Sequence, residues 1–211
     1  MSGMMKRNAG CLLASLLLVL IAVQSTVAYE YLLSASAIRD AYFLGTGPKS
    51  KEASFYEPYT RSYLILPNQP PTSQITIHTP FLQVAEHARD TANYHAQDAV
   101  KEFFGKSMKF QVFLDIYFQR SAGKQEGSET DRPLQGVTIT LTQSHKVIAM
   151  DVVESWELYP FRNAQTLAES PGEHIELACD AGSIESAPLK VEVKTPDGKD
   201  YTVEFDLAGL Q

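Results

Sequence analysis

Apolar and small side chains recur every three or four residues between residues 79 and 105, a spacing that predicts one long helix over about residues 80–104. Thr79 is a favourable N-cap, Pro80 suits the first helical position, and Gly105 can end the helix. The stripe consists of Phe81, Ala85, Ala88, Ala92, Ala96, Ala99 and Phe103. Because alanine permits close approach, we expect this helix to pack on a sheet, with the strand near residues 108–119 as its partner.

A shorter helix is expected over residues 37–44, with Ser34 or Ser36 as its N-cap and Gly45 as its stop. Elsewhere the period changes to two, which predicts strands. Before the long helix the expected strands cover residues 63–66 and 74–79. After it they cover residues 108–119, 137–142, 147–153, 156–158 and 175–179, followed by a hairpin of residues 189–193 and 201–207 around a Pro-Asp-Gly turn.

These elements predict an α+β fold with one long helix (about 80–104) packed on a mostly antiparallel sheet. The closely spaced later strands predict a C-terminal β-sandwich, immunoglobulin-like or similar. Residues 29–106 then form a helix and strand region and residues 107–211 an all-β region. Only residues 105–107 connect the two, too few for independent motion, so we expect one cooperative unit.

The first 28 residues have the pattern of a secretory signal peptide. Lys6 and Arg7 precede an apolar run over residues 9–23, and small or polar residues follow up to Ala28. An uncleaved membrane anchor is the alternative, although the run is shorter than the roughly 20 residues that span a bilayer. We therefore expect export to the periplasm or the cell exterior, and no membrane span once residues 1–28 are removed.

Charge and cysteine content limit the remaining possibilities. Two of the 18 basic residues and none of the 25 acidic residues fall within residues 1–28, so the rest of the chain carries a net charge of −9. This balance argues against nucleic-acid binding. Cys179 is the one cysteine after residue 28, so no internal disulfide is possible there. It alternates with Ile175 and Leu177, and a buried small residue is preferred over a reactive thiol.

The polar face of the long helix offers a candidate metal or acid–base site in His87, Asp90 and His95. Imidazole and carboxylate groups bind divalent cations, and a carboxylate beside a histidine supports proton transfer. The two histidines are eight residues apart, however, which places them about 80° apart around a helix. A solvated face is the competing interpretation. No nucleophile motif, phosphate-binding loop or Cys-x-x-Cys pair occurs, and no cofactor is predicted.

An aromatic, proline-containing segment offers a candidate binding surface in Tyr56, Tyr59, Arg61 and Tyr63. Tyrosine and arginine are enriched at interface hot spots, and exposed rings can stack on sugars. The competing interpretation is that these rings seal one edge of the sheet. Trp156 could likewise belong to a binding surface or to the core, and we expect a core position.

The sequence thus favours an exported, non-catalytic protein with a binding or envelope-structural role and an unknown protein or glycan partner. The alternative is an extracytoplasmic metal-assisted hydrolase that uses the polar face of the long helix. The sequence identifies neither the ligand nor the oligomeric state.

Overall fold

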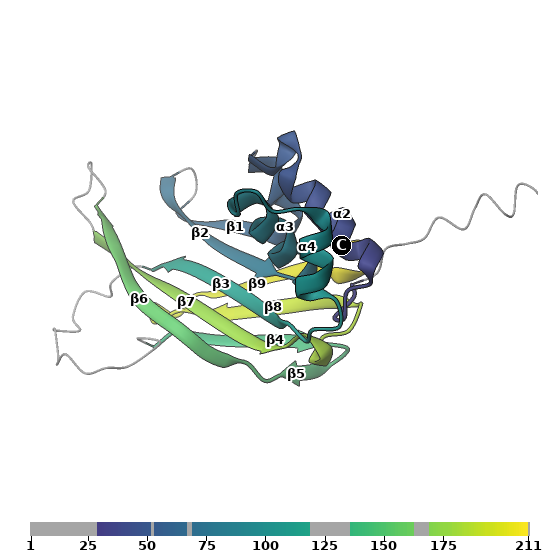
Figure 1. The fold of residues 1–211 in the computed structure, drawn as a ribbon. Coiled ribbons are helices and arrows are strands. Elements are labelled where there is room, and N and C mark those ends of the chain that lie inside the picture. The colour runs from purple at the N-terminus through teal and green to yellow at the C-terminus, as the bar shows by residue number, and fades with distance from the viewer. Residues whose placement is uncertain (1–28, 52, 67–68, 119–135, 163–168, 211) are drawn as a thin grey trace, which may run out of the picture.

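A computed structural model describes residues 29–51, 53–66, 69–118, 136–162 and 169–210. The expected signal segment, residues 1–28, lies outside the described residues. Within the described ranges the fold is α+β, with three α-helices, short 3₁₀ turns and two antiparallel sheets (Figure 1). The helices gather at one end of the molecule, beside β1 and β2, while β6 and β7 extend away from them.

The first described helix, α2 (Ala35–Thr46), begins two residues earlier than expected, because Ser34 is the N-cap and its side chain accepts a hydrogen bond from the Ala37 amide. The expected stop at Gly45 was wrong. Gly45 lies inside α2 and is buried against α3, so the missing side chain permits a close helix crossing rather than a helix end. Ile38 and Ala41 of the same helix are fully buried.

The single long helix was also wrong, because residues 80–104 form two helices, α3 (Pro80–Asp90) and α4 (Ala96–Phe103). Asn93 between them adopts the left-handed region with φ 57°, a conformation that asparagine tolerates better than most residues. The alanine stripe is consequently buried at Ala85, Ala88 and Ala99 but exposed at Ala92. The break allows both helices to pack on α2, which is their main contact.

A five-stranded antiparallel sheet has the order β1-β2-β3-β7-β6. Its strands are β1 (Thr60–Leu66), β2 (Gln69–His78), β3 (Lys109–Tyr117), β7 (Glu169–Asp180) and β6 (Asp151–Arg162). β2 precedes the connection at residues 105–107 and β3 follows it, yet the two strands pair directly. The sheet is therefore built from both of the regions expected from the sequence.

A four-stranded antiparallel sheet has the order β5-β4-β8-β9. Its strands are β4 (Thr138–Gln143), β5 (Lys146–Ile148), β8 (Pro188–Lys194) and β9 (Asp200–Asp206). Alternate residues of both sheets share one core, with Phe110 and Leu114 of β3 in the same buried cluster as Val191 of β8 and Phe205 of β9. Each sheet thus has an inner, apolar face. The outer face of the five-stranded sheet is not part of this shared core.

Two further expectations concern fold details. The strand orders do not confirm an immunoglobulin-like topology, so that assignment stays a prediction.

Cys179 is a buried, free cysteine, as the sequence predicted, and burial raises the pKa of its thiol. Among the described residues, none of the helices has the length and hydrophobicity that crossing a membrane requires.

Candidate functional site

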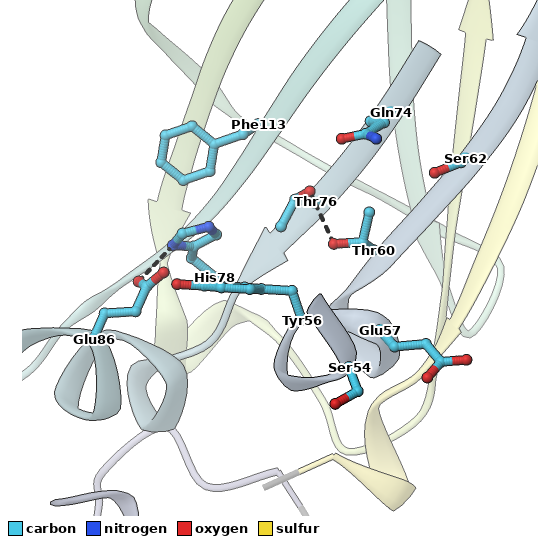
Figure 2. A pocket seen from close by; sticks show the side chains of 10 residues that line it. All are labelled: Ser54, Tyr56, Glu57, Thr60, Ser62, Gln74, Thr76, His78, Glu86 and Phe113. Atoms are coloured by element: carbon cyan, nitrogen blue, oxygen red, sulfur yellow. Dashed lines mark hydrogen bonds and ion pairs between the residues drawn. The ribbon is translucent and has the colours of Figure 1, made fainter. Parts of the chain in front are cut away.

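A cleft of about 740 Å³ lies on the outer face of the five-stranded sheet (Figure 2). Its floor comes from β1, β2 and β3, and its walls come from α3 and the 3₁₀ turns η2 (Ala53–Phe55) and η3 (Glu57–Tyr59). The lining residues are Ser54, Tyr56, Glu57, Thr60, Ser62, Gln74, Thr76, His78, Glu86 and Phe113. Volumes of this size are typical of small-molecule sites.

The floor follows directly from strand alternation in β1 and β2. Residues of one parity, such as Ile75 and Ile77, enter the core, so those of the other parity face the cleft. The strand register then pairs polar side chains across the floor, Thr60 with Thr76 and Ser62 with Gln74. The two threonine hydroxyls lie 3.1 Å apart and hydrogen-bond to each other. The result is a patch of hydroxyl and amide groups on the outer face of β1 and β2.

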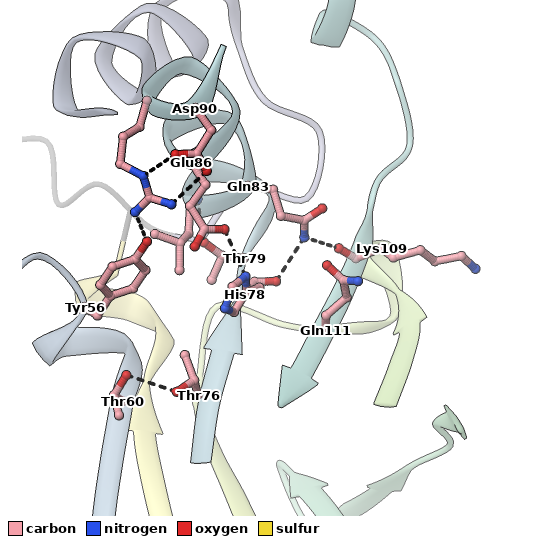
Figure 3. Close-up of polar contacts among 12 residues, drawn as sticks. Tyr56, Thr60, Thr76, His78, Thr79, Gln83, Glu86, Asp90, Lys109 and Gln111 are labelled. Atoms are coloured by element: carbon pink, nitrogen blue, oxygen red, sulfur yellow. Dashed lines mark hydrogen bonds and ion pairs between the residues drawn. The ribbon is translucent and has the colours of Figure 1, made fainter. Parts of the chain in front are cut away.

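The wall is held against the floor by the junction of β2 and α3 (Figure 3). Thr79 caps α3 by accepting a hydrogen bond from the Leu82 amide, so the helix starts one residue after the strand ends. Gln83 then donates to the backbone oxygens of His78, at 3.1 Å, and Lys109, at 2.6 Å. This side chain ties the helix to the ends of two neighbouring strands.

The junction brings His78 and Glu86 together at the side of the cleft. His78 Nδ1 lies 3.0 Å from Glu86 Oε2, and the two side chains are 18% and 19% exposed. The His78 ring also contacts Phe113, with centroids 4.4 Å apart. A carboxylate at Nδ1 fixes the orientation of the imidazole and leaves Nε2 for a ligand or a proton. No described residue forms a hydrogen bond with Nε2.

Tyr56 lies beside Glu86 in the wall of the cleft, and its hydroxyl is held by Arg89, which is not a lining residue. Arg89 donates a hydrogen bond to its hydroxyl and also pairs with the neighbouring Asp90. Burial raises the pKa of the Tyr56 hydroxyl, Glu86 raises it further, and the hydrogen bond from Arg89 opposes the shift. The phenol is therefore neutral at physiological pH and can donate a hydrogen bond.

The aromatic segment proposed from sequence contributes one residue to this cleft. Tyr56 lines it, whereas Tyr59 is 5% exposed and belongs to the core. Arg61 donates to the backbone of η3 and to the Glu204 carbonyl, with its guanidinium over the Phe205 ring. Tyr63 stacks on Tyr201 of β9 with centroids 4.1 Å apart. Arg61 and Tyr63 thus join the two sheets, and Tyr59 is part of the core.

The residues proposed as a metal site have separate partners. His87 lies 3.6 Å from Glu102 and contacts the Tyr94 and Phe103 rings, which connects α3 to α4. Asp90 accepts from Arg89, which lowers the pKa of its carboxyl, and His95 is the exposed N-cap of α4. Within the described ranges, no group of three or more His, Cys, Asp or Glu side chains is placed to hold a metal ion.

The prediction that Trp156 belongs to the core was wrong. Trp156 lies on β6, the edge strand of the described sheet, and is 45% exposed. Its ring stacks on His174 of the neighbouring strand, with centroids 3.9 Å apart and planes 17° apart. Asp115 lies 2.5 Å from Nδ1 of the same histidine, which makes a second histidine–carboxylate pair on this face.

Comparison with known proteins gives no functional assignment. No family matches the sequence, and no curated protein matches it. The functional argument therefore depends on the geometry of the cleft.

Proposed function

We propose that this protein is an exported, non-catalytic binding protein whose cleft holds a neutral, hydroxyl-rich ligand, a glycan. The observation that carries the proposal is the composition of the cleft. Hydroxyl and amide groups form its floor, the rings of Tyr56 and Phe113 stand beside them, and carboxylates occur at Glu57 and Glu86.

The charges in the cleft favour a neutral ligand over an anion. None of its ten lining residues, all in the described part of the chain, is lysine or arginine. The guanidinium of Arg89, which contacts Tyr56 in the wall, is already paired with Asp90 and Tyr56. Phosphate and nucleic-acid ligands need such cations, and the net charge of −9 beyond residue 28 disfavours them further.

The arrangement of polar and aromatic groups favours a sugar. A sugar hydroxyl both donates and accepts hydrogen bonds, and so do Thr60, Ser62, Thr76 and the Gln74 amide. The faces of sugar rings carry C–H groups, which pack on aromatic rings such as Phe113. A purely apolar ligand would leave the Ser62 hydroxyl and the Gln74 amide without partners, at a cost of about 1–3 kcal/mol for each desolvated group.

Export is the cellular setting of the proposal, which follows from the signal-like residues 1–28. A secreted or periplasmic protein that binds a neutral glycan could act in capture or in attachment to the cell envelope. The β-sandwich interpretation fits this role, since it provides a rigid support for an exposed sheet face.

A hydrolase is the second candidate, and the His78–Glu86 pair favours it. With Glu86 at Nδ1, His78 Nε2 could accept a proton from a water molecule in the cleft. The metal-assisted form that uses His87, Asp90 and His95 also remains a proposal. In the described structure His87 contacts Glu102, Asp90 pairs with Arg89, and His95 caps α4. Incubation with a bound oligosaccharide separates the two functions, because a binding protein returns it intact.

The first test is a glycan array that carries neutral and acidic glycans, probed with the full chain and the Gln74→Ala variant. We expect retention of neutral glycans and about tenfold weaker binding by Gln74→Ala, since two hydrogen bonds of about 0.5–1.5 kcal/mol each are lost. Gln97→Ala, an exposed position on α4, is the matched control and should bind as the unmodified protein does. Preferential retention of acidic glycans, or equal binding by both variants, would refute the proposal.

A further inference from the structure

The outer face of the five-stranded sheet continues beyond the cleft towards β6. β6 packs mainly on β7, and β7 on β3 and β6, so none of the described helices is a principal neighbour of these strands. Figure 1 shows the same arrangement, with the helices beside β1 and β2 and with β6 at the opposite edge. This part of the face is therefore accessible to a ligand that extends out of the cleft.

A row of rings crosses this face from the cleft to the edge. His78 of β2 contacts Phe113 of β3, and the Phe113 ring lies 6.2 Å from His174 of β7. His174 in turn stacks on Trp156 of β6. The row thus contains one ring from each of four adjacent strands and begins inside the cleft. Among the described strands β6 is the last of this sheet, and Trp156 on it is 45% exposed.

Hydrogen-bonding groups accompany the rings along the same face. Gln111 donates to Glu176 at 2.8 Å, and Asp115 holds His174. Tyr117 lies across β7 at Gly172, where an added Cβ would come within 2.6 Å of the ring. The glycine therefore lets this ring lie close to the sheet backbone. Rings and polar groups alternate here as they do in the cleft.

We infer that the cleft and Trp156 are two ends of one extended binding surface, and that the ligand is an oligosaccharide rather than a single sugar. This inference rests on the proposed function. Phe113 and Trp156 are two strands apart, which corresponds to about 10 Å across the sheet. A ligand of one ring in the cleft cannot reach that far, whereas a chain of several sugar units can contact both.

The test uses tryptophan fluorescence, because Trp156 is the single tryptophan of the sequence. The full chain is titrated with cello-oligosaccharides and chito-oligosaccharides of one to six units. We expect hexamers to change the emission of Trp156 and single sugars to leave it unchanged. Calorimetric affinity should rise with length until the chain reaches Trp156.

Substitutions on β6 test whether the Trp156 side chain itself contacts the ligand. Trp156→Ala should weaken hexamer binding about tenfold and leave binding of single sugars unchanged, while Trp156→Phe should retain most of the affinity because it keeps a ring on His174. Val152→Ala is the control, since Val152 is exposed on the same strand but pairs with Leu177 on the inner face. Circular dichroism and melting temperature verify that each variant is folded.

The outcomes separate this inference from the proposed function. Equal hexamer affinity of Trp156→Ala and Val152→Ala, together with weakened binding by Gln74→Ala, would overturn the extended surface and leave the cleft as a glycan site. Binding of tetralysine in place of every oligosaccharide would overturn both, because it would identify the carboxylates of this face as a site for basic peptides.

Discussion

Replacing Gly45 by alanine should lower the free energy of unfolding by about 3 kcal/mol, at the upper end of the usual cost of overpacking. A Cβ at this position would lie 1.9 Å from the backbone oxygen of Ala85 and 2.7 Å from its carbonyl carbon. A rotamer change cannot remove a contact with backbone atoms, so α2 and α3 must separate. Ile38 and Ala41, both fully buried, would lose contacts when that happens.

Urea denaturation followed by circular dichroism measures this effect. Gly209→Ala is the control, because its nearest atom would be a side-chain oxygen of Asp206 at 3.4 Å, an ordinary contact. Unfolding midpoints that are the same for the two variants would show that the crossing of α2 and α3 is not as close as described. A folded Gly45→Ala protein should also bind glycans more weakly, since α3 carries Glu86.

Removing the His78 side chain should weaken oligosaccharide binding about thirtyfold, which corresponds to about 2 kcal/mol for a hydrogen bond that involves a charged or strongly polarised group. In the proposed site, His78 Nε2 is the ring nitrogen left for a ligand because Glu86 holds Nδ1 at 3.0 Å. The Glu86→Gln variant should therefore lose about tenfold, because the neutral amide orients the ring less firmly. Both side chains are partly exposed, so we expect small changes in stability.

Isothermal titration calorimetry with the oligosaccharide selected on the array measures these losses. His95→Ala is the matched control, since His95 is exposed at the start of α4 and makes no side-chain capping bond. It also tests the metal-assisted hydrolase, which requires that residue. If the His95→Ala variant loses affinity and the His78→Ala variant retains it, the ligand binds on the polar face of the helices and not in the cleft.

Strands and helix starts could be predicted from local sequence, because each depends on neighbouring residues. Alternation located β3 and the β8–β9 hairpin, the capping side chain of Thr79 located the start of α3, and Ser34 was one of the two caps expected for α2. The break between α3 and α4 was missed because alanine is compatible with both helix and turn. Asn93 was the available signal, as a weak helix former that tolerates positive φ.

The site was harder to predict because it depends on strand register. Thr60 and Thr76 meet only when β1 and β2 are paired, and the same pairing turns Arg61 and Tyr63 towards the other sheet. Tyrosine content alone therefore could not separate Tyr56 from its neighbours. A usable signal did exist for His78 and Glu86. When a strand runs directly into a capped helix, the second helical turn lies over the end of that strand.

The central claim is that the outer-face cleft binds a neutral glycan, and residue-resolved NMR tests it most directly. The ¹⁵N-labelled protein is titrated with the hexasaccharide that binds most tightly. The account predicts shift changes at the amides of Thr60, Ser62, Gln74 and Thr76, with the Trp156 indole N–H changing as well. Changes confined to β4, β8 and β9, or to α4, would contradict it.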